Sequence, residues 1–244
     1  MLTLALESAT DVIGCALGDA DGVVASMVAR RPRLHAESLA PMVEMVLERA
    51  NVRLAEVRVV AVDVGPGLFT GLRAGIATAR SLAFALGVPM VGVRSLDLLA
   101  FAARYRGGRT VSILDARRGE VFWAEYRATP GGVQTVRAPA VARPETVVSE
   151  LVASASGEGG LLVGDGVLRY RDVFAALGGF EVGDPVSSHP SVEHLVGLAH
   201  AKAEREEFVP HESIRPLYLR DPDTRIGWEV RPGIDRRAEV DGDG

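Results

Sequence analysis

Residues 59–87 read VVAVDVGPGLFTGLRAGIATARSLAFALG, and this stretch decides the fold of the chain. The apolar run 59–64 is typical of a buried strand, and it stops at Gly65-Pro66-Gly67. The residues that follow predict a helix over 70–86. Gly87 would close that helix, because glycine readily adopts the left-handed conformation of a helix C-terminus. The stretch therefore predicts a strand, a glycine-rich loop and a helix in succession.

The loop at 65–67 has two interpretations. A glycine-rich loop before a helix can hold an anion on its backbone N–H groups, helped by the positive end of the helix dipole. It can equally be a tight turn. No Gly-Lys-Ser/Thr follows it, so it is not a Walker A loop, and it lacks the G-x-G-x-x-G dinucleotide spacing. A phosphate bound here would have no lysine partner.

The composition is that of an ordinary globular protein. Of 244 residues, 48% are hydrophobic and 24% are charged, enough for one large domain or two smaller ones. No apolar run reaches the about 18 residues of a membrane-spanning helix, and the first residues, MLTLALESAT, do not resemble a signal peptide. A single cysteine, Cys15, favours a reducing compartment. We therefore expect a cytoplasmic protein without a membrane partner. The net charge of −5 argues against nucleic-acid binding through overall charge.

The order of predicted elements repeats along the chain. The first half predicts strands at 2–7, 12–17 and 23–29, a helix at 36–50, the strand and helix described above, a strand at 88–93, and a helix at 95–105 capped by Ser95. The second half predicts strands at 110–115 and 120–126, a third through residue 136, a helix at 144–154, a strand at 161–163, and helices at 167–177 and 191–207.

This repetition predicts an α/β protein with two tandem βββαβα lobes. The N-terminal lobe would span 1–106 and the C-terminal lobe 109–220, joined at Gly107-Gly108, with a loose polar tail at 221–244. Glu7 and Asp115 would end equivalent strands. Such a duplication is the plan of the actin-like ATPase fold (ASKHA, RNase H-like), which actin and hexokinase share.

The apolar stripe of helix 36–50 also has two interpretations. Its members recur at helical spacing and are Leu39, Met42, Val43, Val46, Leu47 and Ala50, with Met45 beside them. A stripe of this kind is usually a core face. It can also receive a partner, because methionine-rich faces adapt to other helices.

Several segments together resemble the TsaB (YeaZ) family, which supports formation of N6-threonylcarbamoyladenosine at position 37 of tRNAs. The matching segments follow one another in family order: LALESAT (4–10), HAESLAPMVEMVL (35–47), GPGLFTGLRAGIATARSLA (65–83), LDARRGEVFWAEY (114–126), LLVGDG (161–166) and PLYLR (216–220). The resemblance covers residues 1–220. The chain departs from the family's usual residues at Glu7, where an aspartate is usual, and at Leu68, where serine is common.

The resemblance implies an actin-like fold that has lost its own catalysis and dimerises with the TsaD transferase. It also implies a TsaE-like ATPase in the same complex, contact with tRNA only through the complex, and a homodimer when the partner is absent. We expect no intrinsic cofactor, with ATP or ADP bound only at the complex with the partner. TsaD proteins carry a metal-binding H-x-x-x-H on the corresponding helix, whereas His35 here has no second histidine at that spacing, so we expect no metal site.

The apolar face of helix 36–50 and the small residues of helix 70–86, together with the resemblance, lead us to expect two sets of functional residues. Helices 36–50 and 70–86 are expected to form the partner interface, with His35, Leu39, Met42, Met45, Val46, Arg49, Gly71, Ala74, Gly75 and Thr78. The positions of a degenerate nucleotide site are expected to be Glu7, Thr10, Gly65, Gly67 and Asp115. No catalytic residue is assigned.

Two catalytic functions are the alternatives. A small-molecule kinase of the same fold would need acids placed for Mg²⁺, and Glu7, Asp115 and Asp165 are the only acids at suitable loop positions. A glycoprotease-like hydrolase would need a metal site or an activated nucleophile, but the five histidines show no zincin spacing and no G-x-S-x-G occurs. A non-catalytic subunit accounts for the missing chemistry and the intact core together.

Overall fold

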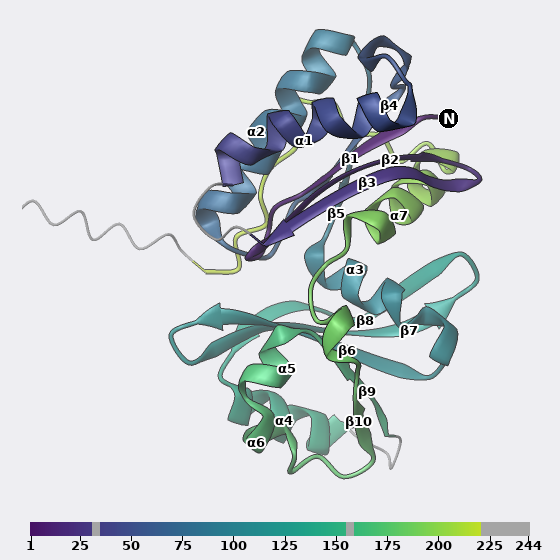
Figure 1. Cartoon of the computed structure of the whole chain (residues 1–244). Helices are drawn as coiled ribbons and strands as arrows, with labels where there is room; N and C mark the ends of the chain where they lie inside the picture. Colours follow the sequence, from purple (N-terminus) through teal and green to yellow (C-terminus); the bar gives the residue numbers. More distant parts are fainter. Residues whose placement is uncertain (31–34, 155–158, 221–244) are drawn as a thin grey trace, which may run out of the picture.

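The chain forms two stacked lobes, each built on a five-stranded mixed sheet (Figure 1). The structure, a computed structural model, describes residues 1–30, 35–154 and 159–220, with only the backbone of residues 35 and 36. The predicted tail at 221–244 lies outside the described residues. Within the described part, no helix is long and apolar enough to cross a membrane.

Both sheets have the same strand order. The first sheet runs β3-β2-β1-β4-β5, with β1 (Thr3–Glu7), β2 (Val12–Asp19), β3 (Gly22–Arg30), β4 (Val59–Asp63) and β5 (Met90–Val93). The second runs β8-β7-β6-β9-β10, with β6 (Arg109–Arg117), β7 (Glu120–Thr129), β8 (Gly132–Ala142), β9 (Gly160–Val163) and β10 (Phe180–Val182). In each sheet the central strand pairs antiparallel with the second strand and parallel with the fourth. The predicted duplication is therefore confirmed, although β10 was not anticipated.

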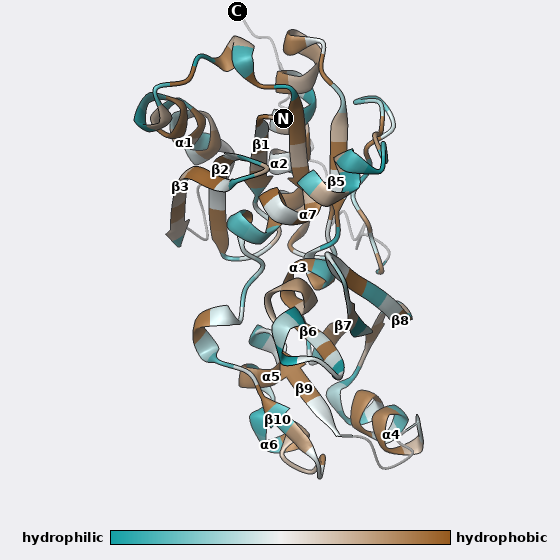
Figure 2. Cartoon of the chain, turned by 90° about the vertical axis from the view of Figure 1, so that its right-hand side faces the viewer, coloured by the Kyte–Doolittle hydropathy of each residue, from teal (hydrophilic) through white to brown (hydrophobic). Residues whose placement is uncertain are grey.

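Helices cover both outer faces and fill the space between the sheets. On the outer face of the first sheet lie α1 (His35–Ala50) and α2 (Phe69–Leu86), and on that of the second lie α4 (Pro144–Ser154), α5 (Asp165–Arg169) and α6 (Arg171–Phe174). Figure 2 shows α7 (Val192–Glu204) and the strongly apolar α3 (Ser95–Ala102) stacked between the sheets. Short 3-10 helices occur at Leu54–Glu56, Arg104–Arg106 and Pro185–Ser187.

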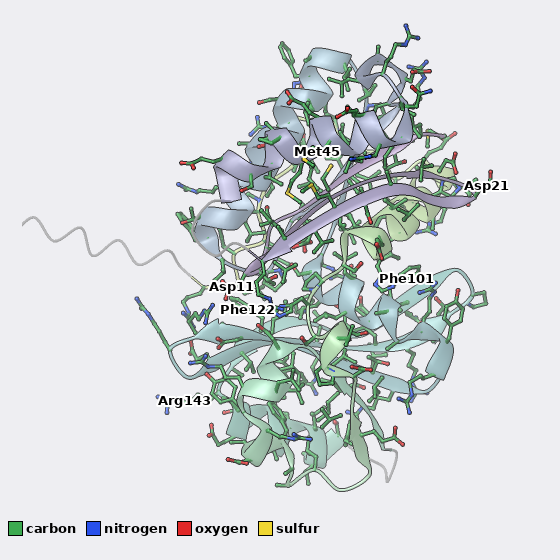
Figure 3. The ribbon with its side chains drawn as sticks, in the orientation of Figure 1. Asp11, Asp21, Met45, Phe101, Phe122 and Arg143 are labelled. Carbon is green, nitrogen blue, oxygen red and sulfur yellow. The ribbon has the colours of Figure 1, made fainter. Side chains whose placement is uncertain are left out.

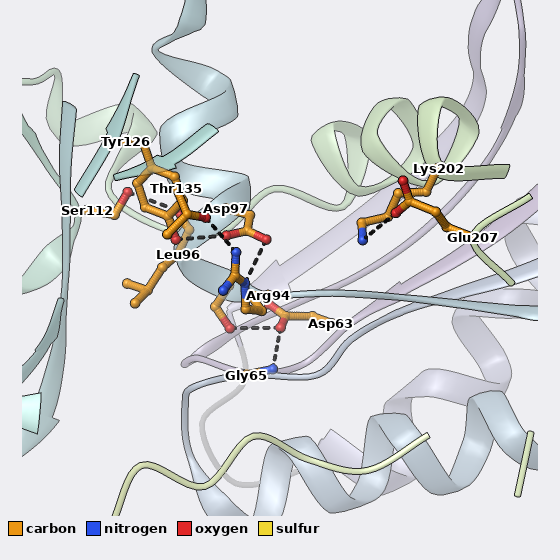
Figure 4. Close-up of polar contacts among 11 residues, drawn as sticks. Asp63, Gly65, Arg94, Leu96, Asp97, Ser112, Tyr126, Thr135, Lys202 and Glu207 are labelled. Atoms are coloured by element: carbon orange, nitrogen blue, oxygen red, sulfur yellow. Dashed lines mark hydrogen bonds and ion pairs between the residues drawn. The ribbon is translucent and has the colours of Figure 1, made fainter. Parts of the chain in front are cut away.

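The two middle helices cross the predicted joint between the lobes. Although α7 follows the second sheet in sequence, it packs on β1, β2 and β5 of the first sheet. Conversely, α3 precedes the joint but packs on the second sheet. Two hydrogen bonds connect them (Figure 4): Leu96 O accepts from Ser112 Oγ at 2.9 Å, and Asp97 Oδ1 accepts from Tyr126 Oη at 2.7 Å. Burial raises the pKa of Tyr126, which keeps its phenol a donor. The domain boundary at Gly107-Gly108 stays a prediction, because α3 and α7 each pack on the sheet on the other side of it.

Two local predictions were wrong. Ser95 does not cap α3, because its Oγ donates to Asp63 Oδ1 at 2.8 Å and the N-cap position belongs to Arg94, whose side chain makes no capping bond. The helix expected at 167–177 is two short helices, because Tyr170 (φ −112°, ψ 36°) leaves the helical conformation between α5 and α6. The left-handed Gly87 at the end of α2 is confirmed at φ 65°.

The small residues of α2 serve close packing inside the lobe. A Cβ on Gly75 would lie 2.1 Å from Ser8 Oγ, and that hydroxyl donates to Gly71 O at 2.9 Å. A Cβ on Gly67 would lie 2.2 Å from Ala9 O. The turn between β1 and β2 thus packs closely against the start of α2. Glycine is required at 67 and 75 because a side chain there would overlap this turn.

We predict that Gly67→Ala lowers the free energy of unfolding by about 1–3 kcal/mol, the usual range for forced overpacking. The backbone carbonyl of Ala9 cannot swing away as a side chain would. Gly178→Ala is the matched control, since an added Cβ meets nothing within 4 Å there. Urea denaturation of both variants measures the difference, and equal midpoints would contradict the packing argument.

Candidate functional site

Two buried acids meet where β1 and β4 end. β1 and β4 are parallel neighbours in register Leu6↔Val62, which brings Glu7 beside Asp63, and each is 1% exposed. Alternation along both strands turns these side chains toward the second lobe, on the same face as the inner core residues Ala5 and Ala61. Sequence reasoning missed Asp63, because it was counted within an apolar strand. An aspartate within the otherwise apolar run 59–64 was the sequence feature that could have identified this site.

The two carboxyl groups share a proton. Asp63 Oδ1 accepts from Gly65 N at 2.6 Å (Figure 4) and from Ser95 Oγ, while Glu7 Oε1 accepts from Ala9 N at 2.7 Å. The other two oxygens, Glu7 Oε2 and Asp63 Oδ2, are buried and receive no N–H or hydroxyl donor in the described part of the chain, so the carboxyls bond to each other. Burial, and then the charge of Asp63, raise the pKa of Glu7 well above its usual range. Burial also raises the pKa of Asp63, against the hydrogen bond from Glu7. Both carboxyl groups therefore bind protons more tightly than exposed carboxyl groups do.

The glycine loop at 65–67 is a tight turn, and the N–H groups of Gly65 and of the next residue, Leu68, are bound within the chain. Gly65 N donates to Asp63, and Leu68 N, at the N-cap of α2, donates to Ala9 O at 2.7 Å. Gly65 adopts a left-handed φ of 99°, and the following peptide bond to Pro66 is cis. Of the two interpretations of the loop, these contacts favour the turn, because N–H groups bound within the chain cannot also hold an anion.

The remaining predicted nucleotide-site positions meet at a nearly closed cleft between the lobes. Thr10 and Gly67 face Asp115 across a cavity of about 20 Å³, room for about one water molecule. Arg117 crosses the cleft and donates to Asp11 Oδ2 at 2.9 Å, where the lobes meet (Figure 3 labels Asp11). Glu7 and Gly65 do not line this cavity.

The acids of the cleft are already engaged. Asp115 forms ion pairs with Arg117 at 3.3 Å and Arg169 at 3.5 Å, and its backbone N donates to Asp165 Oδ1 at 2.9 Å. Burial raises the pKa of Asp165. In this arrangement both carboxylates are bound to groups of the second lobe, and they leave little room for a polyphosphate.

The structure divides the predicted interface residues into buried and exposed groups. Leu39, Met42 and Val46 lie in the core between α1 and the first sheet, and Gly71 and Gly75 are buried on α2, where Gly75 faces Ser8 and Gly71 O accepts from it. Without rearrangement these five cannot touch a partner. Ala74 and Thr78 are half-buried, and Thr78 Oγ1 donates to Ala74 O at 2.9 Å. Arg49 and Met45 are exposed, Met45 by 44% (Figure 3). The side chain of His35 lies outside the described residues.

Other exposed apolar side chains share this helical layer, and sequence reasoning missed them. Phe69 opens α2 and is 41% exposed, and Phe84 near its end is 72% exposed. Tyr218, from the segment after α7, stacks on Phe69 with ring centroids 5.3 Å apart, and the Arg73 guanidinium lies 4.1 Å from the Phe69 ring centre. Large aromatic residues within a helix of small ones were the signal available in the sequence.

Comparisons with known proteins give a consistent family. Residues 17–228 match the family described as "TsaD: tRNA N6-adenosine threonylcarbamoyltransferase". The chain is 33% identical to the tRNA threonylcarbamoyladenosine biosynthesis protein TsaB of Escherichia coli over 236 residues, covering 96% of this chain and 99% of that protein. It is 27% identical to TsaB of Haemophilus influenzae, covering 82% and 85% of the two chains.

Solved structures agree with the sequence relatives. YeaZ from Pseudomonas aeruginosa superposes with a TM-score of 0.79 at 32% identity, covering 89% of this chain and 99% of that one. The ethanolamine utilization protein EutJ from Carboxydothermus hydrogenoformans has a TM-score of 0.53 at 14% identity, covering 82% and 90%, which is a likeness of fold alone. The predicted actin-like ATPase fold is confirmed.

The shared proton predicts an unusual pH dependence of stability. Raised native pKa values mean that the native pair binds protons more tightly than the unfolded chain. The stability it supplies is complete below the unfolded pKa values, near 4, and is lost as pH rises toward the raised native values. In Glu7→Gln the carboxamide N–H can donate a hydrogen bond to Asp63 at every pH, because it does not titrate. Between pH 5 and 8 the wild type should therefore lose more unfolding free energy than the variant, by up to about 1.4 kcal/mol per pH unit.

Urea denaturation at a series of pH values measures this difference. Glu44→Gln, on the exposed side of α1, is the control and should follow the wild type. Parallel curves for the wild type and Glu7→Gln would show that the pair does not share a proton.

Proposed function

We propose a function from the premise that this chain belongs to the TsaB (YeaZ) family and acts in tRNA threonylcarbamoyladenosine biosynthesis. Within that process we propose that it is a non-catalytic subunit that dimerises with a TsaD-like transferase. In this proposal a TsaE-like ATPase joins the same complex, tRNA is reached only through the complex, and any ATP or ADP binds only where the partner contributes to the site.

The non-catalytic role is supported by the state of the acidic residues. A kinase or ATPase of this fold needs carboxylates free to hold Mg²⁺ and room for the phosphates. Here Glu7 is bound to Asp63. Around the cleft of about 20 Å³, Asp115 is bound to two arginines and Asp165 to the backbone of Asp115. These internal bonds would have to break before a nucleotide could enter.

The observation that carries the dimerisation proposal is the apolar surface of the outer helices. Met45, Phe69 and Phe84 are exposed on α1 and α2, which lie side by side on the outer face of the first sheet (Figure 1). A homologous transferase would offer an equivalent helix pair, and two such pairs form a four-helix contact. Because a homologous partner resembles this chain, the same surface would form a homodimer in its absence.

We predict that Met45→Glu weakens binding to the TsaD-like partner by about 2 kcal/mol or more, roughly 30-fold, while leaving the folded chain intact. The side chain is 44% exposed, so the added carboxylate stays hydrated in the monomer and loses water only in the complex. Calorimetric titration of the partner and thermal melting of the isolated variant check both parts.

Met42→Glu is the matched control one turn earlier on α1. Met42 is only 3% exposed and lies in the core, so its replacement by glutamate should lower Tm sharply. Unchanged partner binding by a folded Met45→Glu, or loss of binding only together with unfolding, would defeat the interface proposal.

We further predict that the purified chain hydrolyses neither ATP nor peptides and holds no stoichiometric metal. Phosphate release, peptide cleavage and elemental analysis of the isolated protein are the measurements. The double variant Glu7→Gln, Asp63→Asn separates intrinsic activity from contamination. Hydrolysis by the wild type that the double variant abolishes would overturn the non-catalytic role.

A further inference from the structure

A second cavity, of about 250 Å³, opens on the inner face of the first sheet. It is lined by the end of β1, the start of β2, the last residues of β3, and the segment 186–193 that leads into α7. Half of its lining residues are valine, isoleucine or proline. It is smaller than the roughly 300–1,000 Å³ pockets that hold drug-sized ligands, and therefore suits a small metabolite.

The polar groups of this cavity fall into two kinds. Ser191 Oγ is occupied, because it accepts from the N–H groups of Glu193 and His194 and so caps α7. The Glu193 carboxylate accepts from Ser26 Oγ at 2.8 Å. The hydrogen bonds at the N-terminus of α7 are thus already made within the chain, and neither of these side chains needs a ligand.

Arg30 and His189 retain unused hydrogen-bonding capacity. No carboxylate within the described part of the chain pairs with Arg30, which lines the cavity at the end of β3. His189 Nδ1 is buried and has no partner among the residues described. Burial lowers the pKa of His189, against the charge of Asp165, so the ring is neutral and can donate or accept. Glu7 brings the shared carboxyl pair to the cavity.

We propose that this cavity is a binding site for a small carboxylate that carries a hydroxyl or ammonium group on the neighbouring carbon. Arg30 would take the ligand carboxylate, because a guanidinium fork matches the two carboxylate oxygens. His189 would bind the second group, and the apolar walls would exclude larger polar ligands. One cavity thus brings together a cation and a buried nitrogen that have no partner among the described residues, and this convergence is what points to a ligand. The site does not depend on the proposed function.

Three probes with the same carbon skeleton test the chemistry: propionate, L-lactate and L-alanine differ only in bearing hydrogen, hydroxyl or ammonium at the second carbon. Saturation-transfer NMR with the full chain, titrated to Kd, should show lactate or alanine binding at least tenfold more tightly than propionate. Which of the two binds identifies the second group.

Two variants with matched controls locate the site. Arg30→Gln should raise Kd at least tenfold, whereas Arg49→Gln, exposed at the end of α1, should not. Val28→Phe should fill the cavity, whereas Val24→Phe, on the same face of β3 but outside the lining, should leave binding unchanged. Val28 and Val24 are 56% and 51% exposed, so both variants are expected to fold, which thermal melting checks.

The proposal is overturned if none of the three probes binds. It is equally overturned if the three bind alike, or if binding survives in Arg30→Gln and Val28→Phe, since either result would show contact with the carboxylate or the surface only.

Discussion

The bond between two buried carboxyl groups, Glu7 and Asp63, is the constraint on which the arrangement of the lobes depends. One oxygen of Asp63 holds Gly65 N and Ser95 Oγ together, so it fixes both the glycine turn after β4 and the start of α3. Because α3 is the helix that packs against the second sheet, this acid connects the strand ends of one lobe to the core of the other. Burial of the two acids is compensated by the hydrogen bonds that their carboxyl oxygens accept and by their raised pKa values.

Exchange of helices between the lobes makes the molecule one packed unit. With α7 on the first sheet and α3 on the second, the layer between the sheets contains apolar side chains from both halves of the chain. Ion pairs then close the rim, where Arg117 contacts Asp11. Half-exposed pairs of this kind contribute little stability by themselves. The apolar layer therefore keeps the lobes together, and the charged rim determines how much space remains in the cleft.

On α1, a buried and an exposed methionine lie only three positions apart in the sequence, and the exposed one belongs to the proposed interface. Met42 and Met45 are one turn apart, yet one faces the first sheet and the other faces solvent. The aromatic residues at the two ends of α2 extend the exposed apolar surface, and Tyr218 adds a ring from the end of the described chain. The proposed interface would use residues whose side chains are not buried in the core of the fold.

The sequence by itself determined the duplicated strand order, the glycine turn and left-handed end of α2, and the family, because these depend on local backbone preferences and on motifs read in order. Local pattern could not separate the buried from the exposed members of the predicted interface, since Met45 and Met42 are chemically alike and only packing distinguishes them. It also could not assign Ser95 or Asp63, whose roles come from contacts between segments about thirty residues apart. Tertiary structure alone decided the helix exchange, the closed cleft and the cavity beside Glu7, because each is formed by side chains that meet only when distant parts of the chain pack together.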